Sequence, residues 1–105
     1  MKNTAICLGL LMAGSVFAAQ KGDAAKGKEI VGEQCAVCHN TDSDEKKMGP
    51  ALKGLFKKGK LKNGKAVNDA NVKAVINAGG NGMPAYQDML SDEEKDHVIA
   101  FLKTI

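Results

Sequence analysis

The stretch EQCAVCHN, residues 33–40, carries the residues of this chain most able to do chemistry. Two residues separate Cys35 from Cys38, and His39 follows directly. Thiolates and imidazole bind metals, and two cysteines at this spacing can also exchange electrons as a dithiol. Three kinds of site therefore compete here: a redox dithiol or disulfide, part of a zinc site, and the attachment point of a covalently bound haem.

The rest of the sequence favours the haem. A zinc site needs four ligands, or three and a water, but beyond residue 18 the only other histidine is His97 and there is no further cysteine. A thioredoxin-like dithiol would follow a strand in a βαβ unit, and no such pattern precedes Cys35. A disulfide between Cys35 and Cys38 would leave His39 without a role. In a C-x-x-C-H attachment, both thiols bond to one edge of the porphyrin and the histidine is placed to bind its iron.

The N-terminus has the pattern of a secretory signal peptide. Lys2 precedes an apolar stretch over residues 4–17, and Val16 and Ala18 occupy the −3 and −1 positions of a cleavage site. This stretch is shorter than the roughly 20 residues that a membrane-spanning helix needs. We therefore expect residues 1–18 to be cleaved on export.

Residues 19–105 are then expected to form one small exported domain, with no stable insertion into a membrane. A lipoprotein would be acylated at Cys7, but this cysteine lies too near the start of the chain and follows a bulky isoleucine. The location expected is the periplasm of a Gram-negative bacterium. A domain of this size buries a modest core, so something other than side chains is expected to help fill its interior.

Helical patterns cover most of the expected domain, and no convincing strand appears. The first helix is expected from Asp23 towards His39, the second over residues 68–78 and the third over residues 91–105. Ser91 and Glu94 form the sequence signature of a capping box. Gly27 and Gly32 each disfavour the first helix by about 1 kcal/mol relative to alanine, which indicates that something approaches the helix closely. The fold class expected is all-α.

An iron in a porphyrin has a sixth coordination position, and several residues compete for it. Met83 lies in the loop NAGGNGMPAY, where glycines allow close backbone approach, so it is favoured over Met48 and Met89. Met89 is expected to pack before the third helix, and Met48 lies close to the attachment motif. His97 has acidic neighbours and is expected to face solvent.

Four segments together resemble the class I c-type cytochromes, which carry a single haem. Gly27, Val31 and Cys35 follow one another at steps of four, and the segments MGPALKGLF, GMPAY and HVIAFL come in the family's order. The resemblance covers nearly all of residues 19–105. It implies three main helices and loops wrapped around one covalently bound haem c.

The resemblance also implies roles for individual residues. Cys35 and Cys38 would hold the haem, and His39 and Met83 would bind its iron. The carbonyl of Pro50 would accept the proton on the free nitrogen of His39. In the last helix, Phe101 would cross the first helix at Gly27, which would explain that glycine.

The function implied is one-electron transfer rather than enzymatic catalysis, because His39 and Met83 would leave no open position on the iron. The alternative is a haem-based sensor or small peroxidase in which Met83 is displaced.

The formal net charge is +3, and the charges are segregated: eight lysines and no acid between residues 46 and 65, and five acids and one lysine between residues 88 and 96. We expect a monomer that docks on redox partners with an acidic surface and that does not bind nucleic acid.

Overall fold

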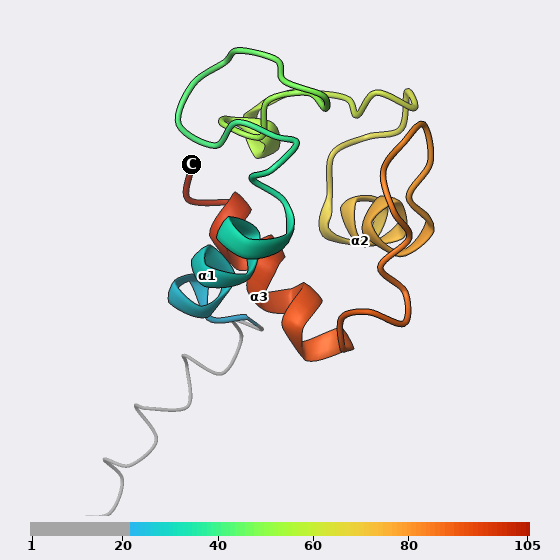
Figure 1. Ribbon diagram of the computed structural model, residues 1–105. Helices are drawn as coiled ribbons and strands as arrows, with labels where there is room; N and C mark the ends of the chain where they lie inside the picture. The colour runs from blue at the N-terminus through green and yellow to red at the C-terminus, as the bar shows by residue number, and fades with distance from the viewer. Residues whose placement is uncertain (1–21) are drawn as a thin grey trace, which may run out of the picture.

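A computed structural model describes residues 22–105 (Figure 1). The expected signal peptide, Cys7 and the start of the exported domain lie outside the described residues. The elements follow in the order α1 (Ala24–Gln34), the 3₁₀-helix η2 (Leu55–Lys57), α2 (Asp69–Ala78) and α3 (Asp92–Leu102). Residues 22–105 contain no β-strand, only isolated bridges at Lys60–Ala66 and Gly80–Met83. The all-α prediction is confirmed.

Each of the three α-helices begins at a side chain that accepts hydrogen bonds from its first turn. A carboxylate oxygen of Asp23 accepts from the amides of Ala25 and Lys26 at the start of α1. At α2, the side chain of Asn68 accepts from the amide of Asn71. At α3, Ser91 and Glu94 complete the predicted capping box. Since these amides have no partner within the helix itself, the caps fix where each helix begins.

The end of α1 differs from the prediction. The helix stops at Gln34 and does not continue towards His39. Residues 35–38 form turns instead, in which the amides of Cys38 and His39 both point to the carbonyl of Cys35, at 3.1 and 3.0 Å. The cysteine motif is therefore a compact turn on the end of a helix.

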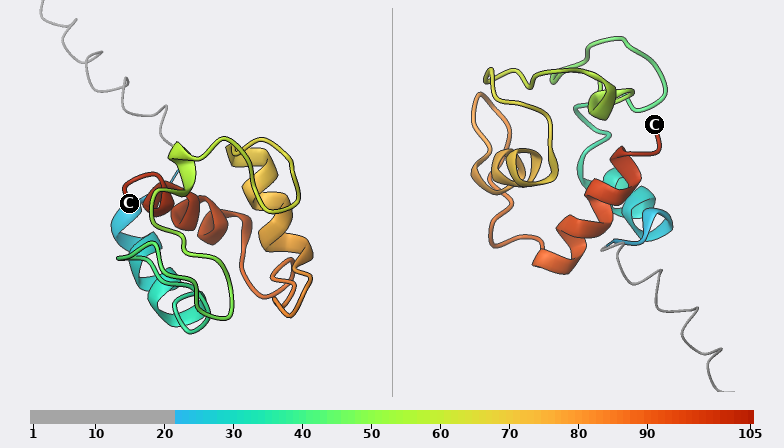
Figure 2. Two further views of the ribbon diagram at one scale, coloured as in Figure 1. Left: turned by 90° about the horizontal axis from the view of Figure 1, so that it is seen from above. Right: turned by 180° about the vertical axis from the view of Figure 1, so that it is seen from behind.

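Helices α1 and α3 pack against each other, and α2 makes far fewer contacts, mainly with α3. The crossing of α1 and α3 is visible from two directions (Figures 1 and 2). The loop between α1 and α2 arches over the end of this pair, and the loop after α2 returns to the start of α3 (Figure 2). None of the described helices has the length and apolar character needed to cross a bilayer.

The core combines a small set of buried side chains with a larger set that is only partly buried. The buried cluster is Val31, Val72, Ile76, Tyr86, Leu90, Val98, Ile99 and Leu102. The partly buried residues that pack on it are Ile30, Cys35, Leu52, Leu55, Phe56, Leu61, Val67, Met83, Phe101 and Ile105. The chain thus leaves apolar surface from several loops at the edge of its core.

Candidate haem site

The imidazole of His39 is held by a hydrogen bond to the backbone of Pro50. Nδ1 of His39 lies 2.6 Å from the carbonyl oxygen of Pro50. A carbonyl only accepts, so the proton is on Nδ1, and the lone pair of Nε2 is free for a metal. This pairing is the one predicted from the resemblance. A hydrogen bond at the far nitrogen also orients a ligating ring and raises its basicity.

The segment that supplies this carbonyl is pinned back onto the cysteine turn. The amide of Gly49 donates to the carbonyl of Cys38 at 2.7 Å, and that of Leu52 donates to Asn40 at 2.8 Å. These two bonds bracket Pro50. Gly49 also lies directly against the imidazole of His39, where a Cβ would overlap the ring. Glycine is therefore required next to the histidine.

The two cysteines carry free thiols, which are not bonded to each other. Burial raises the pKa of the Cys35 thiol, and the neighbouring Cys38 raises it further. The sulfur of Cys38 lies 3.9 Å from that of Met48. Met48 itself is 82 % exposed, so it covers the cysteine turn from the solvent side.

Met83 is set in a tight turn made of glycine and asparagine. The amide of Gly80 donates to the carbonyl of Met83 at 2.9 Å, and the amide of Met83 donates back to Gly80 at 3.0 Å. The two central residues, Asn81 and Gly82, have positive φ of 53° and 91°. Positive φ at both positions is the requirement of a type I′ turn, and Asn-Gly is its preferred sequence. The side chain of Met83 is partly buried and packs on the core cluster.

Gly79 allows this turn to close on the end of α2. Its φ is 65°, and a Cβ at this position would overlap the carbonyls of Met83 and Pro84. A left-handed conformation and a close backbone approach both favour glycine. Gly79 is thus the C-cap of α2 and also a spacer that sets the position of the Met83 turn.

The other candidate ligands have different surroundings. Met89 is 59 % exposed, so the prediction that it packs is wrong. This residue lies in the turn at residues 86–90, just before the cap of α3, and its side chain points outward. His97 is half-buried, and its Nδ1 accepts a hydrogen bond from the amide of Asp23 at 2.9 Å. The ring therefore keeps part of its surface towards solvent, as predicted, and also joins α3 to the start of α1.

Tyr86 connects the Met83 loop to the cysteine turn. Its hydroxyl donates to the carbonyl of Gln34, the last residue of α1, at 2.9 Å. Burial raises the pKa of Tyr86, and Cys35 and Cys38 raise it further. The structure thus brings Cys35 and Met83 to the same cluster and ties their segments together. Sequence reasoning did not find this role of Tyr86, since nothing local marks a contact between residues so far apart in the chain.

These residues fit a covalently bound haem. Two unpaired thiols precede a histidine whose Nε2 is free, and a thioether lies in a preformed turn on the same core. Partly buried apolar side chains from several segments, among them Leu52 and Phe56, offer the surroundings that a porphyrin needs. Glycine is required at positions 49 and 79. The main chain, and not a side chain, therefore lies next to each of the two candidate ligands.

Comparison with known proteins identifies the family of the chain. Residues 22–102 match the family model described as cytochrome c oxidase, cbb3-type, subunit III. Among solved structures, the chain is similar to cytochrome c6 from the diatom Phaeodactylum tricornutum, with a TM-score of 0.64 and 26 % identity over 79 % of this chain and 93 % of that one. Proteins of this kind carry covalently bound haem c and transfer electrons. The chain belongs to this cytochrome c family and is a class I c-type cytochrome.

Proposed function

We propose that the mature protein is a periplasmic one-electron carrier with a single haem c. Cys35 and Cys38 form the two thioether bonds, and His39 and Met83 are the axial ligands. When bound, haem c supplies an iron that gains and loses one electron. The observation that carries the proposal is the 2.6 Å contact from Nδ1 of His39 to Pro50, because it leaves Nε2 as the metal-binding atom directly after the two thiols.

The chain's own residues adjust the affinity for the electron. A methionine ligand raises the reduction potential relative to a second histidine. Pro50 increases the basicity of His39 through its hydrogen bond and holds the ring in one orientation. With His39 and Met83 both bound to the iron, a substrate could reach it only by displacing one of them, which supports electron transfer over a peroxidase or sensor function.

The distribution of charge supports a docking surface for an acidic redox protein. Every lysine from Lys46 to Lys65 is exposed. Val37 in the cysteine turn and Met48 beside it are 71 % and 82 % exposed, and Nζ of Lys47 donates to the carbonyl of Ala36 at 3.0 Å. An apolar patch with lysines around it fits the anatomy of transient interfaces, in which a hydrophobic centre has a polar rim.

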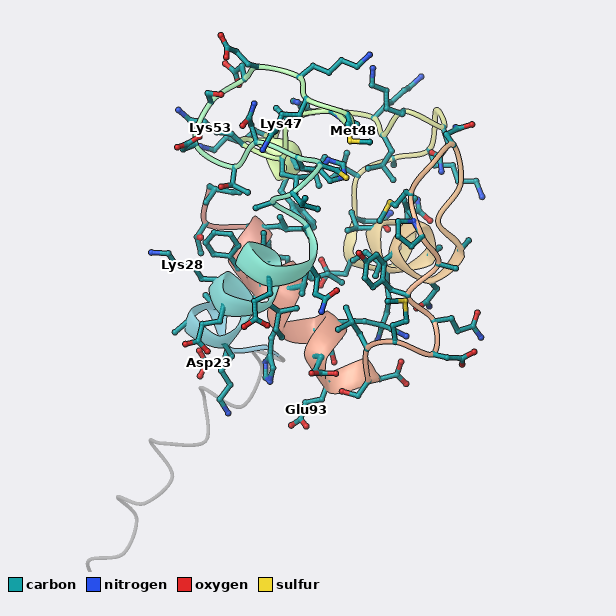
Figure 3. All side chains as sticks on the ribbon, in the orientation of Figure 1. Asp23, Lys28, Lys47, Met48, Lys53 and Glu93 are labelled. Atoms are coloured by element: carbon teal, nitrogen blue, oxygen red, sulfur yellow. The ribbon has the colours of Figure 1, made fainter. Side chains whose placement is uncertain are left out.

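Figure 3 shows lysines of residues 46–65 far from an acid of residues 88–96, although three exposed acids, Asp42, Asp44 and Glu45, directly precede Lys46. Lys47, Met48 and Lys53 lie at one end of the molecule, and Glu93 projects from the opposite end. We name the exposed residues Val37, Met48 and the lysines of residues 46–65 the basic end. A molecule with such a charge separation is oriented by the field of a partner before contact.

The ligand assignment is tested by optical spectra of ferric protein. The wild type is expected to show the weak long-wavelength band of iron–sulfur ligation, and Met83→Ala to lose it. Met48→Leu and Met89→Leu remove a thioether of the same kind elsewhere and are expected to keep the band. Loss of the band in either control with retention in Met83→Ala would reassign the ligand. A native high-spin iron that binds carbon monoxide readily would instead favour the sensor or peroxidase alternative.

A further inference from the structure

Three helices hold one dipeptide of the loop that carries Met83. The amides of Tyr86 and Gln87 donate to the carbonyls of Ile76 and Asn77 in α2, at 2.9 and 3.3 Å. The hydroxyl of Tyr86 reaches α1, through Gln34, at 2.9 Å. Nζ of Lys95 in α3 donates to the carbonyl of Gln87 at 3.1 Å. We call these four hydrogen bonds the 86–87 clasp.

Lys95 is an unexpected member of this clasp because it is buried. The residue is only 2 % exposed, and an ammonium group loses much of its hydration free energy when it leaves water. Its nearest carboxylate oxygen, on Asp92, is 3.7 Å away and belongs to a side chain that is 85 % exposed. An apolar residue of similar size would fill the same space without this loss. The hydrogen bond to the Gln87 carbonyl is therefore the specific interaction that only the lysine provides.

The clasp lies close to Met83 along the chain. Only Pro84 and Ala85 separate the Met83 turn from Tyr86. Pro84 has a fixed φ and so removes part of the freedom of this short link. On the other side, the turn is closed against Gly79. The backbone of Met83 therefore cannot move far from its place unless the link moves, and the link is anchored at residues 86 and 87.

We propose that Tyr86 and Lys95 are positioning residues that keep Met83 on the iron. This inference rests on the proposed role of Met83 as axial ligand. An external ligand would bind the iron only after Met83 had left, and we infer that the backbone of the loop moves with Met83 and breaks hydrogen bonds of the clasp. The free energy needed to break these hydrogen bonds opposes the binding of an external ligand. A variant that lacks one of the bonds needs less free energy to release Met83. External ligands then bind more tightly, although neither residue touches them.

The test uses ferric holoprotein and imidazole as the probe. Tyr86→Phe removes one hydroxyl and keeps the ring, and Lys95→Met removes the ammonium and keeps the length of the side chain. Each variant is expected to bind imidazole about tenfold more tightly than the wild type, which corresponds to roughly 1.4 kcal/mol, about one buried hydrogen bond. Backbone amide exchange at residues 86 and 87 is expected to be faster in both.

Lys103→Met is the matched control. Lys103 also lies next to α3 and reaches α2, since its Nζ is 2.9 Å from a carboxylate oxygen of Asp69. The substitution changes the charge by the same amount but leaves the 86–87 clasp intact. Its imidazole affinity is expected to equal that of the wild type. An equal rise in Lys103→Met and Lys95→Met would mean that loss of charge, not loss of the clasp, is responsible, and would overturn the proposal.

The outcomes separate this inference from the function on which it rests. If wild-type ferric protein shows no iron–sulfur band, the assignment of Met83 fails, and the clasp has no ligand to hold. If the band is present and neither Tyr86→Phe nor Lys95→Met changes the imidazole affinity, only the positioning role is wrong. Should Lys95→Met fail to fold, Tyr86→Phe decides alone, because it leaves the core packing in place.

Discussion

Gly27 lies directly against the backbone carbonyl of His97, where α1 crosses α3. A Cβ on Gly27 would overlap this carbonyl and would also press on the Cβ of Phe101. The contact with Phe101 is the one implied by the resemblance. Gly22, just before α1, has the same relation to the carbonyl of Asp96. Two glycines near the start of α1 thus let the backbones of the two helices meet without side chains between them.

The substitution Gly27→Ala is expected to destabilise the protein strongly. The added methyl group meets main chain, which cannot rotate away, so the helices must separate. Overpacking of this kind typically lowers the free energy of unfolding by about 1–3 kcal/mol. Denaturant unfolding followed by far-UV circular dichroism measures the change.

Gly32→Ala is the matched control, because it lies in the same helix with no atom within 4 Å of the added Cβ. Here the better helix propensity of alanine is expected to raise the free energy of unfolding by about 0.5–1 kcal/mol. The two substitutions thus have opposite signs. Equal effects at both positions would show that Gly27 matters only through helix propensity and that the close crossing is wrong.

The contrast between Gly27 and Gly32 shows where the sequence is informative and where it is not. Both glycines interrupt a helical pattern, and the sequence predicts a close approach for each. Only Gly27 has one, since Gly32 is exposed. The face of a helix that meets a partner is decided by the partner, which lies about seventy residues later in the chain. By contrast, the caps at Asp23 and Ser91 depend on amides two or three residues away and could be predicted directly, and for the second helix the sequence narrows the cap to Asn68 or Asp69, of which the structure shows Asn68.

The candidate site divides in the same way. The cysteine turn, His39 and Met83 are marked by local motifs, and the sequence names them all. The Asn81-Gly82 dipeptide also gives a local signal for the turn before Met83. Tyr86 and Lys95 act through carbonyls that carry no sequence information, so their roles emerge only from the structure. The end of α1 was also missed, because bonds from Gly49 and Leu52 fix the segment that follows it.

Removal of the cofactor is expected to unfold much of the domain. The double variant Cys35→Ala/Cys38→Ala cannot form thioethers, so acidified organic solvent should extract its haem and leave the wild-type haem in place. Apolar side chains such as Leu52, Phe56 and Met83 are only partly buried by protein. Binding to the folded state alone stabilises it, and the haem-free variant is expected to lose most of its helical dichroism at 25 °C.

Mass spectrometry provides the complementary observation on the wild type. The intact protein should correspond to residues 19–105 with one haem attached. A disulfide between Cys35 and Cys38, or two free thiols, in protein made with a working haem-ligation system would contradict the attachment. A haem-free chain that still unfolds cooperatively at the wild-type temperature would contradict the structural contribution of the cofactor.

Tyr86 makes the stability of the protein depend on pH in the alkaline range. Burial is the main cause that raises its pKa in the folded state; the smaller contributions of Cys35 and Cys38 vanish once their sulfurs are thioethers. An unfolded tyrosine titrates near pH 10. As the pH rises above about 10, the tyrosine of the unfolded chain loses its proton before that of the folded protein does. The contribution of Tyr86 to the free energy of unfolding is therefore complete below about pH 10 and is lost as the pH rises towards the folded pKa.

The comparison of wild type with Tyr86→Phe isolates this effect from the titration of lysines, which both proteins share. The wild type is expected to be more stable than the variant by about 1 kcal/mol at pH 8, the usual contribution of one hydrogen bond. This difference should shrink between pH 10 and pH 11, as measured by denaturant unfolding at each pH. A difference that stays constant up to pH 11 would mean that Tyr86 is not protected from ionisation by burial.

The basic end is expected to guide anionic partners to the haem edge. A small anionic oxidant, hexacyanoferrate(III), serves as a probe that has no docking surface of its own. Lys47→Glu places a negative charge beside Met48, whereas Lys28→Glu makes the same change in net charge on the exposed side of α1, outside the basic end (Figure 3). At 0.1 M ionic strength, charges act over about 10 Å, so stopped-flow oxidation of the reduced protein should slow several-fold in Lys47→Glu and much less in Lys28→Glu.

At 1 M salt the screening length falls to about 3 Å, and the three proteins should react at similar rates. If both variants slow the reaction equally at 0.1 M, the oxidant responds to net charge alone and electrons do not leave through the basic end.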